Sequence, residues 1–130
     1  MSADNLQSTY LRLRPDSSIE KLPADASFWP RLMAGQLGDF HGEYLVTSFD
    51  YSSDWPSWEM HPNGDEIVCL IAGRIDFILE APDGQHRTLE LSQPGSFAFV
   101  PQGTWHTAKT ATPTTLLFIT AGEDTQHRPA

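Results

Sequence analysis

The chain has 130 residues, one cysteine and a formal net charge of −9. A chain of this length forms one domain that buries roughly two thirds of its unfolded surface, so a single core is sufficient without disulfides. The acidic surplus argues against a nucleic-acid partner, because neutralising a phosphate backbone takes clustered lysine and arginine.

Neither a leader nor a membrane span is evident. The first residues, Met1 to Gln7, lack a basic stretch followed by an apolar run, and no apolar run approaches the ~20 residues that a membrane span requires. We therefore expect a cytoplasmic protein with no membrane partner.

In chain order, residues 1–38 mix polar residues and prolines with a short apolar patch at Phe28, Trp29, Leu32 and Met33. This pattern predicts an irregular N-terminal arm with room for one helical turn, packing on the domain that follows. Residues 39–121 form that domain, and residues 122–130 are expected to be a C-terminal tail.

From residue 43 onward, short β-type runs alternate with turn residues such as Pro62-Asn63-Gly64 and Pro82-Asp83-Gly84. About eight strands at this spacing predict an all-β sandwich or jelly roll. The expected strands are 44–51, 57–61, 66–71, 74–81, 87–91, 96–100, 104–108 and 115–121.

Metal-type side chains surround the turn at Pro62. Because successive side chains of a strand point to opposite faces, Glu59 and His61 share one face. After the turn, Glu66 opens a strand that can return antiparallel and aim its carboxylate at that face, with Asp65 as the nearby substitute.

A second histidine, His106, stands just after the turn Pro101-x-Gly103, from which a distant strand could deliver a fourth ligand. Two imidazoles with one or two carboxylates suit Mn, Fe, Ni or Zn better than Ca or Mg. The predicted cofactor is therefore one of these divalent transition metals.

These residues match the two motifs of the cupin superfamily. The first motif reads Glu59-x-His61, four residues, Glu66, six residues, Gly73; the second reads Gly95, five residues, Pro101-x-Gly103, two residues, His106. The chain thus resembles a small single-domain cupin of the cupin-2 kind, with Glu59 in place of the usual first histidine. The resemblance implies a double-stranded β-helix, or jelly-roll barrel, and a metal held by His61, Glu66 and His106.

Strand parity also predicts which side chains point outward. If Glu59, His61 and Glu66 point into the barrel, an apolar set points out, namely Trp58, Met60, Ile67, Cys69 and Ile71. This face is too apolar to be left in water, so either the N-terminal arm or a second subunit covers it, and we expect a homodimer. Cys69 is expected to be a packed thiol, and Phe97, Phe99 and Trp105 are expected in the core.

The sequence indicates the ligands of the site but leaves two functions open. One hypothesis is a metal-dependent dioxygenase or isomerase acting on a small polar or aromatic acid, with Glu59, His61, Glu66 and His106 as ligands and either glutamate able to dissociate and act as base. The alternative is a non-catalytic binding or sensor module, with or without metal. No further acid-base residue inside the barrel is evident, and His41, His86 and His127 are assigned solvated or structural roles.

Overall fold

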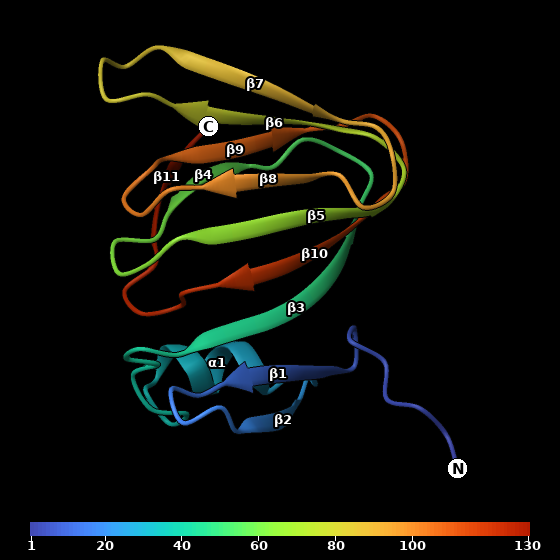
Figure 1. The fold of residues 1–130 in the computed structure, drawn as a ribbon, viewed down its shortest axis with the longest axis vertical. Helices are drawn as coiled ribbons and strands as arrows, with labels where there is room; N and C mark the ends of the chain where they lie inside the picture. Colours follow the sequence, from blue (N-terminus) through green and yellow to red (C-terminus); the bar gives the residue numbers. More distant parts are fainter.

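The computed structural model describes residues 1–130, and its regular secondary structure is almost entirely β-strand (Figure 1). All eight expected strands are present, with ends within two residues of those predicted. They are β3 (Tyr44–Tyr51), β4 (Ser57–Met60), β5 (Glu66–Ala72), β6 (Ile75–Glu80), β7 (His86–Leu91), β8 (Phe97–Val100), β9 (His106–Lys109) and β10 (Thr114–Thr120). The all-β prediction is therefore confirmed.

The strands form two antiparallel sheets, the arrangement of a jelly roll. The six-stranded sheet has the order β2-β1-β3-β10-β5-β8, and the five-stranded sheet has the order β11-β4-β9-β6-β7. Neighbours in these sheets are mostly distant in sequence, so residues from separate parts of the chain can meet at one end of the barrel. No helix in the structure has the length and apolar character needed to cross a membrane.

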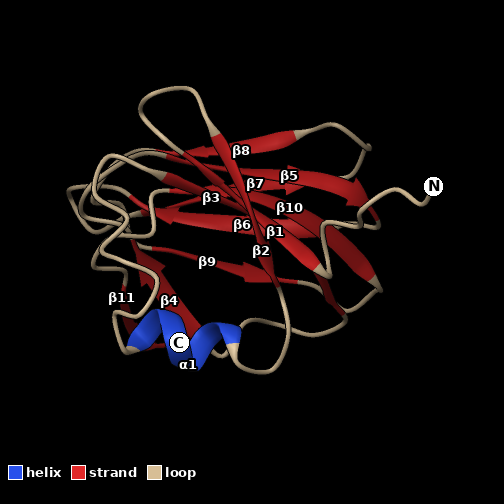
Figure 2. Ribbon diagram, turned by 90° about the horizontal axis from the view of Figure 1, so that it is seen from below, coloured by secondary structure: helices blue, strands red, loops and turns tan.

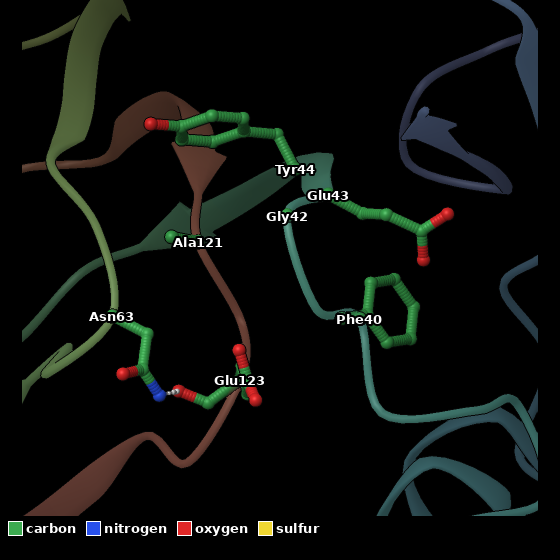
Figure 3. Close-up of a pocket in the computed structure, with 7 residues that line it drawn as sticks. All are labelled: Phe40, Gly42, Glu43, Tyr44, Asn63, Ala121 and Glu123. Carbon is green, nitrogen blue, oxygen red and sulfur yellow. Dashed lines mark hydrogen bonds between the residues drawn. The ribbon is translucent and has the colours of Figure 1, made fainter. Parts of the chain in front are cut away.

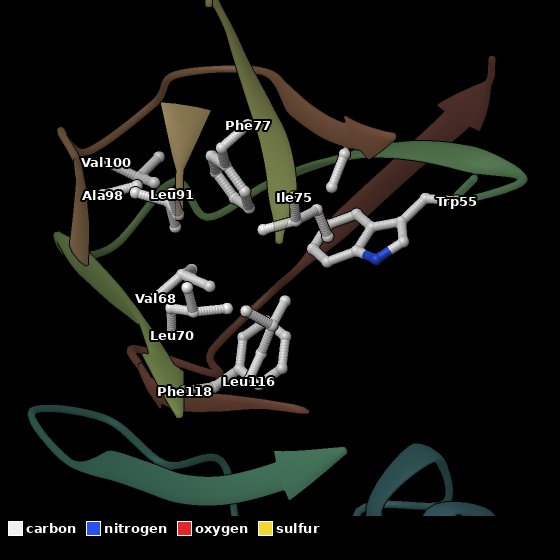
Figure 4. Packing of buried hydrophobic residues seen from close by; sticks show 11 residues of the cluster. Trp55, Val68, Leu70, Ile75, Phe77, Leu91, Ala98, Val100, Leu116 and Phe118 are labelled. Atoms are coloured by element: carbon white, nitrogen blue, oxygen red, sulfur yellow. The ribbon is translucent and has the colours of Figure 1, made fainter. Parts of the chain in front are cut away.

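The space between the sheets is filled by apolar side chains (Figure 4). On β5, Val68 and Leu70 are fully buried while the alternate residues point out, as parity predicted. The buried cluster draws on both sheets; its members are Trp55, Val68, Leu70, Ile75, Phe77, Leu91, Ala98, Val100, Ala108, Leu116 and Phe118.

The expectation that Phe97 and Phe99 lie in the core is wrong, since their side chains are 58% and 50% exposed. On β8 the inward positions belong to Ala98 and Val100, which are almost fully buried. Alternation along the strand then forces both phenylalanines outward, although they are larger and more apolar than alanine. Trp105 is only partly buried.

The N-terminal segment is more regular than expected. It contains a hairpin of β1 (Thr9–Leu13) and β2 (Ile19–Pro23), which extends the six-stranded sheet beside β3, and the short helix α1 (Phe28–Met33). Buried Arg12 forms ion pairs with Glu20 and Glu43 at 2.9 and 3.5 Å, which explains how a charged residue can sit in this hairpin. The expected helical turn is confirmed, but the arm is not irregular.

Helix α1 packs on the side of the hairpin that continues the barrel interior. Phe28 is buried against Tyr10, Leu22, Phe40 and Leu45, in a small second core. Figure 2 shows the helix against the strands, with the N-terminus projecting away from them. The arm leaves the outer side of β5 and β8 uncovered, since Ile71, Phe97 and Phe99 are exposed there.

The C-terminal segment also differs from the expected tail. Residues Gln126–Pro129 form strand β11, which pairs antiparallel with β4 at the edge of the five-stranded sheet. Gln126 faces Met60 and His127 faces Glu59 in this register. The segment after β10 is therefore placed directly beside the strand that carries the first predicted ligand.

The predicted apolar outer face divides between the two sheets. Trp58 and Met60 belong to β4 of the five-stranded sheet, whereas Ile67 and Ile71 belong to β5 of the six-stranded sheet. The expectation that all four residues share one outer face is therefore wrong, because strand parity does not indicate which strands belong to the same sheet. The more exposed apolar surface is on the six-stranded sheet.

Candidate metal centre

Three structural elements bring the four predicted ligands to one end of the barrel. Glu59 lies on β4 and His61 follows that strand, while Glu66 is the first residue of β5 and His106 the first of β9. Pairing of β4 with β9 sets Glu59 opposite His106. One ligand atom from each of Glu59, His61 and His106 lies within 4.8 Å of the other two, a spacing that could hold a metal ion.

Glu66 lies between the two imidazoles. Its Oε2 is 3.2 Å from His61 Nε2, and its Oε1 is 3.1 Å from His106 Nε2. All three side chains are almost completely buried. Thr120 on β10 donates a hydrogen bond of 2.6 Å to Oε2, which holds this carboxylate from the neighbouring strand.

The facing atoms of this group lack hydrogen-bonded partners. His61 Nε2, His106 Nε2 and Glu66 Oε1 are buried and, despite their short separations, make no contact with hydrogen-bond geometry. Buried polar atoms in proteins are nearly always satisfied, so three converging exceptions call for an explanation. A cation among them would satisfy all three.

The outer nitrogens of both histidines are engaged. His106 Nδ1 lies 3.0 Å from the carbonyl oxygen of Thr104, so it must donate, and His61 Nδ1 lies 2.9 Å from the hydroxyl of Thr125. When Nδ1 carries the proton of a neutral imidazole, the lone pair sits on Nε2. His106 thus presents the Nε2 lone pair to the Glu66 carboxylate, and His61 does the same when Thr125 accepts from its Nδ1. With these donors the residues fit a divalent transition metal.

The charges of the site are strongly coupled. Burial acts to raise the pKa of Glu66, but contacts with His106 and His61 outweigh it and lower the pKa to about 2. Burial likewise acts to lower the pKa of His106, and Glu66 outweighs it so that the pKa is raised. The carboxylate is therefore ionised at neutral pH and attracts positive charge, which either protons or a metal ion can supply.

The other candidates do not join the centre. Asp65, the alternative to Glu66, is exposed and accepts a hydrogen bond of 2.8 Å from the backbone N–H of Gln102. Cys69 lies on the outward side of β5, away from the ligands. His41 lies 3.1 Å from Glu123, and His86 packs on Trp58 with ring centroids 4.9 Å apart.

Access to the centre is narrow. Inside the barrel, His106 stacks on Phe77 with ring centroids 5.5 Å apart and contacts Trp55 edge-on, so the interior beneath the site is filled. Among the four ligand candidates only Glu59 has a partly exposed side chain, at 30%. A ligand must therefore approach from the side of Glu59.

None of the four ligand candidates lines the pocket that is drawn in Figure 3. It has a volume of about 140 Å³, with Asn63 and Glu123 hydrogen-bonded across one side. Its lining residues are Phe40, Gly42, Glu43, Tyr44, Asn63, Ala121 and Glu123. This pocket does not supply a substrate cavity over the metal centre.

Sequence reasoning missed three residues around the centre. Thr120 and Thr125 contact Glu66 and His61 through their hydroxyls, and His127 Nε2 lies 3.3 Å from Glu59 Oε1. Thr120 lies on the predicted strand beside the site, so its inward parity could have indicated a contact. The other two lie in the segment expected to be a tail, where no signal pointed to them.

The sequence matches no protein-family model and no curated protein. Solved structures do resemble it. Hydroquinone 1,2-dioxygenase from Sphingomonas sp. TTNP3 has a TM-score of 0.51 at 20% identity, covering 59% of this chain and 59% of the other. Peruvianin-I, a cysteine peptidase from Thevetia peruviana latex, has a TM-score of 0.55 at 16% identity, covering 66% and 56%. Bacillus subtilis oxalate decarboxylase has a TM-score of 0.52 at 21% identity, covering 67% and 23%.

The two antiparallel sheets and these likenesses show that the chain has the jelly-roll fold that the two motifs predicted. The chain spans 59%, 56% and 23% of the three proteins, so it corresponds to a part of each. Their names state three different activities, which agrees with the general finding that a fold does not determine a reaction.

Proposed function

We propose that this cupin binds one divalent transition metal, Mn, Fe, Ni or Zn, through Glu59, His61, Glu66 and His106. The observation that carries the proposal is the convergence of the unpartnered Nε2 atoms of both histidines on the buried Glu66 carboxylate. Two imidazoles and two carboxylates form a donor set that suits these metals. The Mn(II) centres named for the similar oxalate decarboxylase agree with this choice.

We further propose an enzymatic role on a small polar or aromatic acid, as a dioxygenase or isomerase. A metal at this site supplies a Lewis acid that can bind a carboxylate or enol. Glu59 is the ligand that faces the approach to the site, so it can dissociate and accept a proton from a substrate there. The 4-hydroxybenzoate bound to the similar hydroquinone dioxygenase is a small aromatic acid of the proposed kind.

The second candidate is a non-catalytic ligand-binding or sensor protein. The packed core beneath His106 and the narrow access at Glu59 favour it, because they leave little room around an ion for substrates to react. Multiple turnovers of a small acid by the metal-loaded protein would favour the enzyme. Ligand-dependent spectral change of the metal without product would favour the binding protein.

Metal content tests the proposal directly. We expect untagged protein to contain close to one equivalent of a divalent transition metal, as purified or after reconstitution, by elemental analysis. Replacing His61 or His106 by alanine should remove the ion while the circular dichroism of the β-barrel is retained. His86→Ala is the matched control, because this histidine is about half exposed and contacts Glu80 and Trp58, not the four ligands. Less than about a tenth of an equivalent in both wild-type samples would refute metal binding.

We also propose a homodimer formed through the outer face of the six-stranded sheet. Apolar residues continue across neighbouring strands there: Ile67 pairs with Phe99 and Ile119, and Cys69 pairs with Phe97 and Leu117. An exposed apolar face of this kind marks an interface, and a flat face can pair with itself about a two-fold axis.

Light scattering after size exclusion at micromolar concentration should give the mass of a dimer. Replacing Phe97 and Phe99 together by serine should give the mass of a monomer, because both side chains project from the proposed interface. Leu89→Ser, at an exposed leucine of the other sheet, is the control and should stay dimeric. A monomer mass for the wild type would contradict the proposal.

A further inference from the structure

The segment after β10 runs along the outer side of the metal centre. Strand β11 lies beside β4 in Figure 1, in the register that sets His127 opposite Glu59. Thr125, one residue before the strand, reaches His61. One short segment therefore contacts two of the four proposed ligands.

Thr125 is placed to fix the tautomer of His61. Its hydroxyl oxygen is 2.9 Å from His61 Nδ1 and 3.5 Å from the carbonyl oxygen of Gly122. If the hydroxyl donates to that carbonyl, its oxygen accepts a hydrogen bond from Nδ1–H of His61. The lone pair of the neutral ring is then fixed on Nε2, which faces Glu66 at 3.2 Å.

His127 contacts Glu59 on the oxygen that points away from the centre. Its Nε2 is 3.3 Å from Oε1, whereas Oε2 of the same carboxylate is 3.9 Å from His106 Nε2. The two oxygens face different partners, so His127 and an ion need not compete for the same atom. A carboxylate held at one oxygen loses less rotational freedom when the other binds a metal.

The segment is anchored independently of these two contacts. The Arg128 guanidinium lies over the rings of Trp105 and Trp58, at 4.5 and 5.1 Å from their centroids, and its Nη2 is 2.9 Å from Glu80 Oε1. Changes at Thr125 or His127 should therefore leave the strand in place. A change in metal affinity or in the spectrum of the bound metal can then be assigned to the lost contact.

We propose that Thr125 and His127 are positioning residues of the metal centre, which raise its affinity and define its coordination by orienting His61 and Glu59. This inference rests on the proposed metal-binding function. It assigns a role to a segment that no cupin motif includes, and it gives the histidine beside Glu59, the one ligand position that departs from the motif, a function.

The test is a titration with Co²⁺, followed by isothermal calorimetry and by the visible absorption bands of the bound ion. Thr125→Val and His127→Gln should each weaken binding about 10- to 100-fold, the usual cost of losing such a supporting contact, and should shift the absorption bands. Thr125→Ser keeps the hydroxyl and should bind Co²⁺ with wild-type affinity. His86→Gln is the control for His127, because His86 is similarly exposed and also lies beside a glutamate, Glu80, at 3.7 Å.

A double substitution separates orientation from a general effect on the strand. If His127 acts through Glu59, then His127→Gln should change neither affinity nor spectrum further in a Glu59→Gln background. An additional loss there would show that His127 does not act through Glu59. Equal affinities, within about threefold, and equal spectra for wild type, Thr125→Val and His127→Gln would overturn the inference while leaving metal binding intact. Failure of the wild type to bind Co²⁺ or any reconstituted metal would overturn both.

Discussion

Replacing Glu66 by glutamine is expected to lower the free energy of unfolding of the metal-free protein by roughly 3 kcal/mol at neutral pH. Burial raises the pKa of this carboxyl group and contacts with His106 and His61 lower it, with a net change from 4.5 to about 2. A shift of this size corresponds to about 3 kcal/mol of extra stability for the ionised form in the folded protein. Glutamine keeps the shape and can accept the hydrogen bond from Thr120, but it has no charge to offer the imidazoles.

The loss of stability caused by Glu66→Gln should become smaller as the pH is lowered. A depressed pKa in the folded state stabilises the protein above the unfolded pKa of 4.5, and this stabilisation is lost as the pH falls toward 2. Wild type and Glu66→Gln should therefore converge as the medium is acidified. Urea unfolding in the presence of chelator, at about pH 7, 5 and 3.5, would measure the difference.

An exposed glutamate provides the control for this series. Glu90 lies on the outer strand β7, where it pairs with Arg74 at 3.2 Å, and Glu90→Gln should change stability by well under 1 kcal/mol. If Glu66→Gln is as stable as wild type at neutral pH, the carboxylate is not stabilised by the two histidines. A difference that does not change with pH would point instead to altered packing.

Substitution of Glu59 is expected to change both the affinity and the choice of metal. Glu59→Ala should weaken binding about 10- to 100-fold, because a supporting ligand interaction is lost. Glu59→His restores a neutral imidazole, so it should keep binding but shift the preference toward softer or later metals. In the wild type the second carboxylate makes the site harder, which favours Mn or Fe over Cu.

Competition titrations with Mn, Zn and Ni on the three proteins would decide this point. Glu90→Ala removes a carboxylate far from the ligands and serves as the control for the loss of one negative charge. Equal binding of each metal by wild type and Glu59→Ala would show that Glu59 is not a ligand. Its exposed position would then suit a base or a hydrogen-bonding group that faces the substrate.

The convergence of the four candidate ligands could be predicted from the sequence because most of its signals are local. Glu59 and His61 are two residues apart at the end of β4, and the turn at Pro62 leads directly into β5, which opens with Glu66. The expected antiparallel return is wrong, because β4 and β5 lie in different sheets, but the short turn still places Glu66 3.2 Å from His61. The position of His106 could not be predicted from local alternation, because this residue lies on a strand more than forty residues further along the chain. The spacing of the second cupin motif supplied that information, and β4–β9 pairing in the structure brings it opposite Glu59.

The parts that were missed depend on partners far along the chain. Thr125 and His127 meet residues 64 and 68 positions earlier, and nothing in a four-residue strand such as Gln126–Pro129 indicates that pairing. Arg12 likewise interrupts the apolar pattern of β1, and its burial makes sense only with Glu20 and Glu43 beside it. Short strands stabilised by tertiary contacts escape pattern-based prediction because their own residues carry little preference.

The arrangement of ligands between the two sheets has a kinetic consequence. Glu66 extends from the six-stranded sheet, whereas Glu59 and His106 belong to the five-stranded sheet. An ion bound by all of them would be a cross-link between the halves of the barrel, and the halves could not separate without breaking coordination bonds. Metal loading would then slow the global opening of the domain, so that amide protons deep in both sheets exchange more slowly together.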